Sequence, residues 1–308
     1  MTRTPVALAL LVTGAAVVLV AAPAVEQAMY GGSYGRNMVS SETGLPADWD
    51  IKAGKNVKWW ADVGSQAYAG PVLAGGQVFV GTYNDGLRNP DEPNDRGVVM
   101  AFQEADGAFQ WQKTHEKLAA GRIHDWPQQG VCSTPAIEGD RLWYTSNRAT
   151  MVCLKTDGSQ VWEYDMMGEL DVFPHNLAVS SPLVVDGILY ATTGNGVDEG
   201  HVNIPVPMAP SFIALNADTG ELVWESALPG ENILHGTWSN PAYGVIQGRA
   251  QVIFPGGDGW VYSFEPKTGE LLWKFDCNPK DSEWVLGGRG TRNNLISTPV
   301  IWEDKVYI

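Results

Sequence analysis

The residues best suited to chemistry lie in long irregular stretches between runs of alternating apolar residues. Histidine titrates near neutral pH and can act as a general base, so His235 is the candidate catalytic residue. Arginines can clamp carboxylate or sulfate groups of an anionic ligand, or can simply pair with neighbouring acids at the surface. With imidazole and indole side chains from the same stretches, they form a candidate ligand- or cofactor-binding set of Arg122, His124, Trp126, His175, Trp238, Arg289 and Arg292.

A candidate metal site lies in the stretch that follows Tyr190. There Thr192, Thr193, Gly194 and Asn195 are followed closely by Asp198 and Glu199. Amide and carboxylate oxygens are the ligands that calcium prefers. The same residues also form ordinary loops, so the sequence leaves both interpretations open.

These stretches lie between repeats of a short motif in which three residues separate a turn glycine from a tryptophan. Asp-Gly and Thr-Gly between alternating apolar runs are tight-hairpin signals, because glycine adopts a positive φ without a steric clash. The motif therefore predicts an antiparallel strand pair at each of residues 107–111, 158–162, 220–224 and 269–273.

The repeats are spaced about fifty residues apart, as in proteins built from repeated units. The tryptophans at 60, 111, 162, 224 and 273 follow this spacing, and so do prolines that open strands, such as Pro135, Pro182 and Pro241. Each unit holds four predicted strands. Four-stranded antiparallel units of this length predict an all-β fold, a β-propeller. A β-sandwich, the alternative, does not require the same tryptophan and proline in every unit.

The predicted strands assign the connecting loops to two faces of the propeller. Loops between first and second strands and between third and fourth strands are mostly tight turns, whereas the other two classes are long and share the opposite face. Four of the five histidines fall on this long-loop face. Function concentrates on loops that a rigid scaffold positions, so this rim is the predicted site for a protein or small-molecule ligand. The alternative is that the polar loops only cap the channel.

Residues 214–224 and 263–273 carry a tryptophan motif that resembles the repeat of the pyrroloquinoline-quinone (PQQ) propeller family. That family includes quinoprotein dehydrogenases and non-catalytic assembly scaffolds. The resemblance implies an eight-bladed ring, of which this chain, stopping at Ile308 inside a fifth unit, would hold about half. It also implies that Asn195 matches an asparagine that helps bind calcium beneath the quinone in the enzymes.

Departures from the enzyme pattern favour a different role. The resemblance implies two adjacent cysteines and an aspartate base, but Cys132, Cys153 and Cys277 are not adjacent, and His235-Gly-Thr-Trp238 stands where the base is expected. No Cys-x-x-Cys-His haem motif is present. The expected function is a binding or scaffold module that uses the long-loop rim, and the alternative is a PQQ- and calcium-dependent dehydrogenase of alcohols or sugars.

Composition limits the partners and the location. Thirty-five acidic residues against twenty basic ones give a net charge of −15, which argues against nucleic acid and anionic membrane surfaces. The uncharged run after Arg3 indicates a signal peptide or an uncleaved membrane anchor at 1–24, and hence a periplasmic or secreted protein. A linker at 25–56 and a partial propeller at 57–308 follow, with blades at 68–113, 131–164, 178–226 and 237–276 and the start of a fifth at 297.

Overall fold

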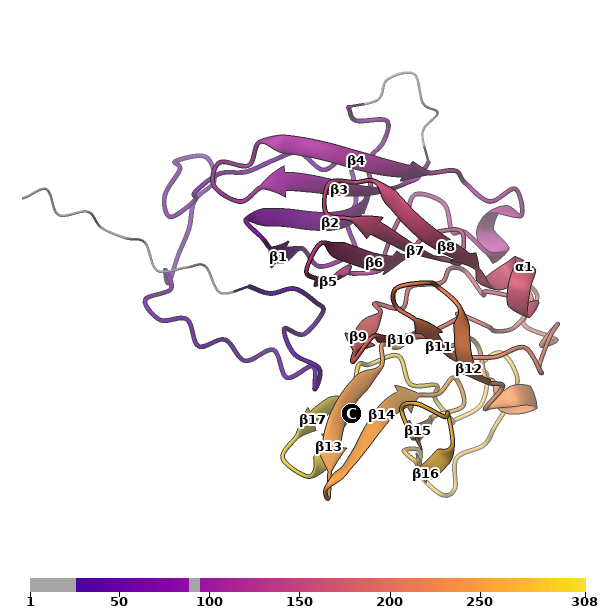
Figure 1. The fold of residues 1–308 in the computed structure, drawn as a ribbon. Coiled ribbons are helices and arrows are strands. Elements are labelled where there is room, and N and C mark those ends of the chain that lie inside the picture. Colours follow the sequence, from indigo (N-terminus) through magenta and orange to yellow (C-terminus); the bar gives the residue numbers. More distant parts are fainter. Residues whose placement is uncertain (1–25, 89–94) are drawn as a thin grey trace, which may run out of the picture.

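The computed structural model describes residues 26–88 and 95–308, and over these residues the protein is built almost entirely of antiparallel sheets (Figure 1). Four sheets hold four strands each, and a fifth holds two. In every sheet the strands are hydrogen-bonded in the order in which they follow one another in the sequence. The all-β propeller class predicted from the repeats is therefore confirmed.

The strands are grouped by blade. Blade 1 contains β1 (Val72–Ala74), β2 (Gln77–Tyr83), β3 (Gly97–Gln103) and β4 (Phe109–His115). Blade 2 contains β5 (Ala136–Glu138), β6 (Arg141–Thr145), β7 (Thr150–Lys155) and β8 (Gln160–Asp165). Blade 3 contains β9 (Leu183–Val185), β10 (Ile188–Thr192), β11 (Phe212–Asn216) and β12 (Leu222–Ser226). Blade 4 contains β13 (Ala242–Ile246), β14 (Arg249–Pro255), β15 (Trp260–Phe264) and β16 (Leu271–Asp276), and β17 (Val300–Trp302) and β18 (Lys305–Tyr307) follow.

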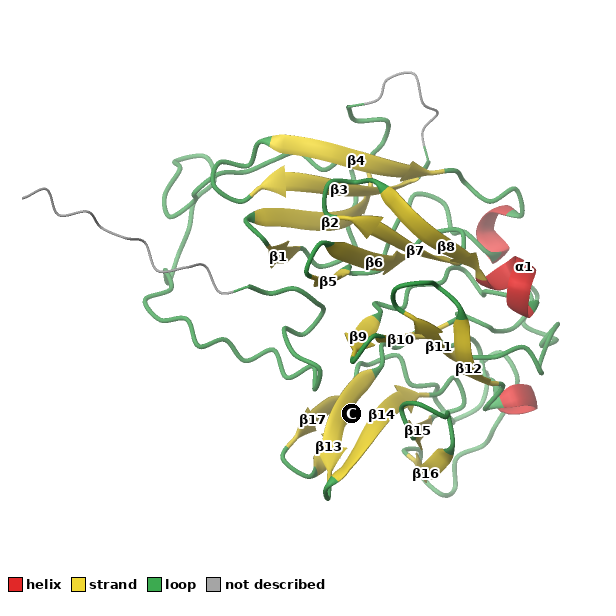
Figure 2. Ribbon diagram, viewed as in Figure 1, coloured by secondary structure: helices red, strands yellow, loops and turns green. Residues whose placement is uncertain are grey.

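Within residues 26–88 and 95–308, helix is confined to short turns in the loops (Figure 2). They are α1 (Met166–Leu170), η1 (Gly121–Ile123) and η2 (Gly230–Asn232). All three lie in connections between one blade and the next, on the long-loop side of the sheets. The first strands β5, β9, β13 and β17 contact one another in succession, so the blades fan around a shared inner edge.

The four repeated tryptophans occupy equivalent positions, as the repeats predicted. Each lies on the fourth strand of its blade opposite a small residue of the third strand, and the register shifts at the next third-strand position. The pairs are Ala101–Trp111, Cys153–Trp162, Ala214–Trp224 and Ser263–Trp273.

Each tryptophan that precedes a complete blade stacks on the turn glycine of that blade. Trp111 lies on Gly158, where an added Cβ would come within 2.8 Å of the indole ring. Its Nε1 donates a hydrogen bond to the carbonyl of Thr156 at 2.9 Å. The arrangement recurs at two further tryptophans. Trp162 lies on Gly220 and donates to the carbonyl of Ala217. Trp224 lies on Gly269 and donates to the carbonyl of Pro266. The glycine–tryptophan motif therefore joins neighbouring blades as well as forming hairpins.

The series begins at Trp59, and the choice of Trp60 is wrong. Trp60 is 70% exposed, whereas Trp59 lies on Gly107 and donates from Nε1 to the carbonyl of Glu104 at 2.7 Å. Residues 57–63 form no strand, although alternate side chains of this segment pack on the core of blade 1. The segment thus contacts blade 1 as a preceding fourth strand would.

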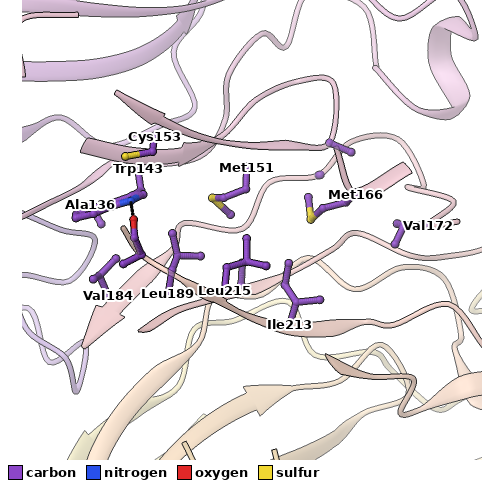
Figure 3. Close-up of a cluster of buried hydrophobic side chains, with 14 of the residues drawn as sticks. Ala136, Trp143, Met151, Cys153, Met166, Val172, Val184, Leu189, Ile213 and Leu215 are labelled. Atoms are coloured by element: carbon purple, nitrogen blue, oxygen red, sulfur yellow. Dashed lines mark hydrogen bonds between the residues drawn. The ribbon is translucent and has the colours of Figure 1, made fainter. Parts of the chain in front are cut away.

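Apolar side chains fill the space between blades 2 and 3 (Figure 3). Met151 of β7 packs there with Leu189 of β10 and Leu215 of β11, and all three are fully buried. Trp143 of β6 spans the layer and donates from Nε1 to the carbonyl of Ala217 at 3.0 Å. Burial of this layer removes apolar surface from water and holds the two blades as a rigid base for the loops above them.

Residues 27–36, which lie within the segment assigned as a linker, run along the first strands of successive blades. Gln27 pairs with Leu73 of β1. Further along, the carbonyls of Tyr34 and Gly35 accept hydrogen bonds from the backbone of β13 and from the N–H of Ile301 in β17. The segment thus connects the inner edges of the blades.

Arg36 anchors this segment. Its guanidinium is fully buried, and burial lowers its pKa to about 9. It donates hydrogen bonds to the carbonyls of Tyr30, Ser181, Pro182 and Pro241. The cation is therefore held by backbone dipoles from two blades rather than by a carboxylate.

The signal peptide or anchor expected at 1–24 lies outside the described residues. Within the described part of the chain, no helix has the length and apolar character needed to cross a bilayer. The three cysteines are free thiols.

Candidate functional site

Three long loops meet on the rim above blades 2, 3 and 4. They are the loop after α1, the loop after β10 and the loop before β13. Short backbone ladders join them: Gly196 N–H donates to the carbonyl of Phe173 at 3.0 Å, and Val197 N–H donates to the carbonyl of His235 at 2.9 Å. Positions far apart in the sequence are thereby fixed against one another.

Each of these loops contributes one histidine to a cluster. His175, His201 and His235 place one ring nitrogen each within 4.8 Å of the others. Their ring centroids lie 4.5–4.9 Å apart. Trp238 packs edge-on against His235 with centroids 4.8 Å apart. We call His175, His201 and His235 the histidine cluster.

Hydrogen bonds orient the cluster. The Nδ1 of His175 lies 2.8 Å from the carbonyl of Val197, so this nitrogen carries the proton and Nε2 carries the lone pair. The Nε2 atoms of His175 and His235 are both buried, and neither has a hydrogen-bond partner among the described residues. Trp238 donates from Nε1 to the backbone carbonyl of His175 at 3.0 Å.

Two imidazoles of the cluster, those of His175 and His235, have lowered pKa values. Burial, followed by the proximity of His175 and His201, lowers the pKa of His235 to about 4. Burial also lowers the pKa of His175, although the hydrogen bond to the Val197 carbonyl opposes this. At neutral pH both rings are therefore neutral and offer lone pairs.

Two glycines allow the close packing. A Cβ at Gly196 would lie 2.7 Å from the Cβ of His175 and 2.5 Å from the carbonyl oxygen of His235. Gly287, with φ +77°, contacts His201 just as closely. Its N–H donates to the carbonyl of Leu234 at 2.7 Å. A fourth loop, the one before β17, therefore supports the cluster from outside.

A pocket of about 440 Å³ opens beside the cluster. The guanidinium of Arg122 lies over the ring of Trp126, 4.1 Å from its centroid, and leaves one wall of the pocket positively charged. Glu199 is exposed at the pocket. The pocket is lined by Arg122, Ile123, Trp126, His175, Asn176, Glu199, His201 and His235.

The structure thus brings together several of the residues singled out from the sequence: Arg122, Trp126, His175, Glu199 and His235. Trp238 and His124 support this group. The Nδ1 of His124 lies 2.8 Å from the carbonyl of Pro174, and its ring packs against Phe173 with centroids 4.4 Å apart.

The two later arginines do not line this pocket. Arg289 is exposed and reaches the carbonyl of Gly200 at 3.4 Å. Arg292 bonds to the carbonyl of Asp258 and the carboxylate of Asp276, beside a separate pocket. Arg292 therefore holds the loop before β17 against blade 4.

Two of the residues predicted for calcium, Asn195 and Asp198, form hydrogen bonds with other protein groups. Asn195 is fully buried: its Oδ1 accepts from the N–H of Phe173 at 3.0 Å, and its Nδ2 donates to the carbonyl of Val206 at 3.1 Å. Asp198 accepts from the N–H of Val202 and the amide of Asn203. Asn195 thus bonds to two loops, whereas Asp198 bonds within its own loop.

The sequence analysis did not single out His201. It lies only two residues after Glu199, in the loop searched for calcium ligands, and nitrogen was not considered as a donor there. His201 is one of the four histidines that the strand pattern places on the long-loop face, and this count was the signal that pointed to it.

Four-stranded blades joined by tryptophan docking define a PQQ-like repeat β-propeller. A family model described as "Outer membrane protein assembly factor BamB" matches residues 95–308. This match covers more than half of the chain, and the protein belongs to that family.

Relatives with different names share the fold. The chain is 23% identical over 281 residues to "Outer membrane protein assembly factor BamB" of Yersinia pestis, covering 82% of this chain and 61% of the relative. It is 27% identical over 152 residues to "Alcohol dehydrogenase (quinone), dehydrogenase subunit" of Gluconacetobacter polyoxogenes, covering 49% of this chain and 18% of the relative. The chain thus spans less than two thirds of either relative.

A solved structure, "Europium-containing methanol dehydrogenase", superposes with a TM-score of 0.59 at 16% identity. The alignment covers 87% of this chain and 53% of that one. At this identity the superposition supports the propeller fold alone.

Proposed function

We propose that this protein is a secreted or periplasmic binding or scaffold module that recognises its partner through the long-loop rim. The observation that carries the proposal is the pocket beside the histidine cluster, to which separate loops contribute charged, aromatic and imidazole side chains. Such a concave site with converging polar groups is typical of ligand recognition. A relative named as an outer membrane protein assembly factor supports a scaffold role.

The internal hydrogen bonding of the enzyme-like residues favours this function over quinone chemistry. Asn195, the counterpart of a calcium ligand, is held by Phe173 and Val206. It positions the loop that carries His201. The oxygens of Asp198 likewise close a turn.

A PQQ- and calcium-dependent dehydrogenase is the second candidate. One observation favours it, the similarity to a quinone-dependent alcohol dehydrogenase. Against it, Asn195 and Asp198 already form hydrogen bonds with other protein groups.

Site-directed cross-linking tests the scaffold role. A photoreactive amino acid replaces exposed Glu199 at the pocket in the full-length protein, and the control places it at exposed Asp157, in a tight turn on the opposite face. We expect a discrete adduct from position 199 and none from position 157. Equal labelling at both positions would contradict a rim-specific partner.

Calorimetry with PQQ and calcium, together with dye reduction across alcohols and sugars, tests the second candidate. We expect no saturable binding and no turnover by the full-length protein. Tight binding accompanied by dye reduction would overturn the scaffold proposal in favour of the dehydrogenase. Fractionation of cells that express the protein with its N-terminal segment tests the expected location.

A further inference from the structure

We propose that His175, His201 and His235 bind one divalent transition-metal ion of the zinc class, with an open coordination position toward the rim pocket. This site is separate from the calcium site considered above and uses none of its residues. It does not depend on whether the rim also binds a protein partner.

The spacing of the three rings suits one ion. Zinc binds imidazole nitrogens at about 2.0–2.1 Å in tetrahedral geometry, which separates two ligand nitrogens by about 3.3 Å. The three nitrogens here lie within 4.8 Å of one another. His201 is only partly buried and sits on a loop, so rotation of its side chain can close the remaining gap.

The buried nitrogens point independently to a ligand. His175 is 2% exposed, and its Nε2 has no hydrogen-bond partner among the described residues. The Nε2 of His235 is buried and unpartnered in the same way. Leaving a buried polar atom unpaired costs about 1–3 kcal/mol, and two such atoms on rings whose centroids lie 4.5 Å apart are unusual. A shared cation satisfies both lone pairs.

The surroundings of His175 match those of a metal ligand. Metal-binding histidines commonly donate their second ring N–H to a carbonyl or carboxylate, which fixes the tautomer and the ring. His175 does this with the carbonyl of Val197 at 2.8 Å. Trp238 packs against His235 and bonds to the His175 backbone, so two ligands are positioned by one side chain.

The donor atoms select the class of metal. Imidazole nitrogens suit zinc, copper, nickel and iron, whereas calcium and magnesium prefer oxygen. Structural zinc sites are usually closed by four protein ligands, while three ligands leave a position for water or an added donor. Here the three imidazoles line the pocket that also contains Arg122, so an anionic oxygen donor is the expected fourth ligand.

Titration of the full-length, tag-free protein tests the site. The protein is stripped with a chelator and titrated with zinc by calorimetry. Cobalt absorption then reports the coordination geometry. We expect one zinc per chain at the cluster and a rise in melting temperature as zinc is added. His201→Ala should weaken zinc binding at least about 100-fold, since changes merely adjacent to ligands often cost 10–100-fold.

Glu231→Gln is the matched control, because Glu231 is exposed on the loop that carries His235 but lies outside the cluster. It should bind zinc as the wild type does. Absence of stoichiometric binding by the wild type would overturn the proposal, and so would binding that survives unchanged in His201→Ala.

X-ray absorption of the zinc-loaded wild type provides a second test that needs no variant. We expect imidazole nitrogens at about 2.0 Å. A sulfur shell near 2.3 Å would place the metal on a cysteine and refute the site.

Discussion

Replacing Trp224 with alanine tests whether tryptophan docking holds the blades together. Trp224 is 7% exposed, lies on Gly269 of blade 4 and donates to the carbonyl of Pro266 at 2.8 Å. Truncating a buried tryptophan costs about 3–5 kcal/mol, and we expect this loss of unfolding free energy in urea melts of the full-length protein. Trp224→Phe should cost about 1 kcal/mol, because Tyr190 still donates to the same carbonyl.

Trp60→Ala is the control for this experiment, since that ring is 70% exposed. Its removal should change the unfolding free energy by less than about 0.5 kcal/mol. A loss for Trp224→Ala no larger than that for Trp60→Ala would refute the inference that the indole is a joint between blades.

Three further predictions concern buried polar groups. Burial lowers the pKa of His115 to about 3. Because His115 takes up a proton in the unfolded chain first, the free energy of unfolding should fall from pH 6.5 towards pH 3, by about 2 kcal/mol at pH 5. In melts at a series of acid pH values, His115→Gln should show a smaller dependence of this free energy on pH. Arg36→Met should lower the unfolding free energy by at least about 2 kcal/mol, whereas Arg249→Met, at an exposed position, should not. Burial raises the pKa of Cys153 to about 12, so iodoacetamide should modify it only after unfolding; rapid labelling of the native protein would contradict this.

The blades could be predicted from the sequence because each repeat carries its own local signals. The turn at Gly220 and the alternating residues before Trp224 are determined by neighbours a few positions away. The position of Trp59 was missed because the choice between two adjacent tryptophans depends on the turn of blade 1. There the contact with Gly107 and the carbonyl of Glu104 selects the first of the pair.

The N-terminal segment shows a different limit. Glycine, serine and tyrosine around residues 30–36 have no periodicity, and composition of this kind is typical of a linker. Its order comes from contacts with strands far away in the sequence, such as the bond from Arg36 to the carbonyl of Pro241. No pattern within the segment could reveal those partners.

The rim site was partly predictable, and Asn195 shows why the prediction was incomplete. The strand pattern placed the histidine-bearing loops on one face, but the role of each side chain depends on which backbone groups it meets. Asn195 bonds to Phe173, two residues before His175, and to Val206, beyond His201. It therefore joins two of the loops that carry the histidine cluster. The buried amide thus holds together the loops of the histidine cluster, and the ion that we propose uses the histidines and not Asn195.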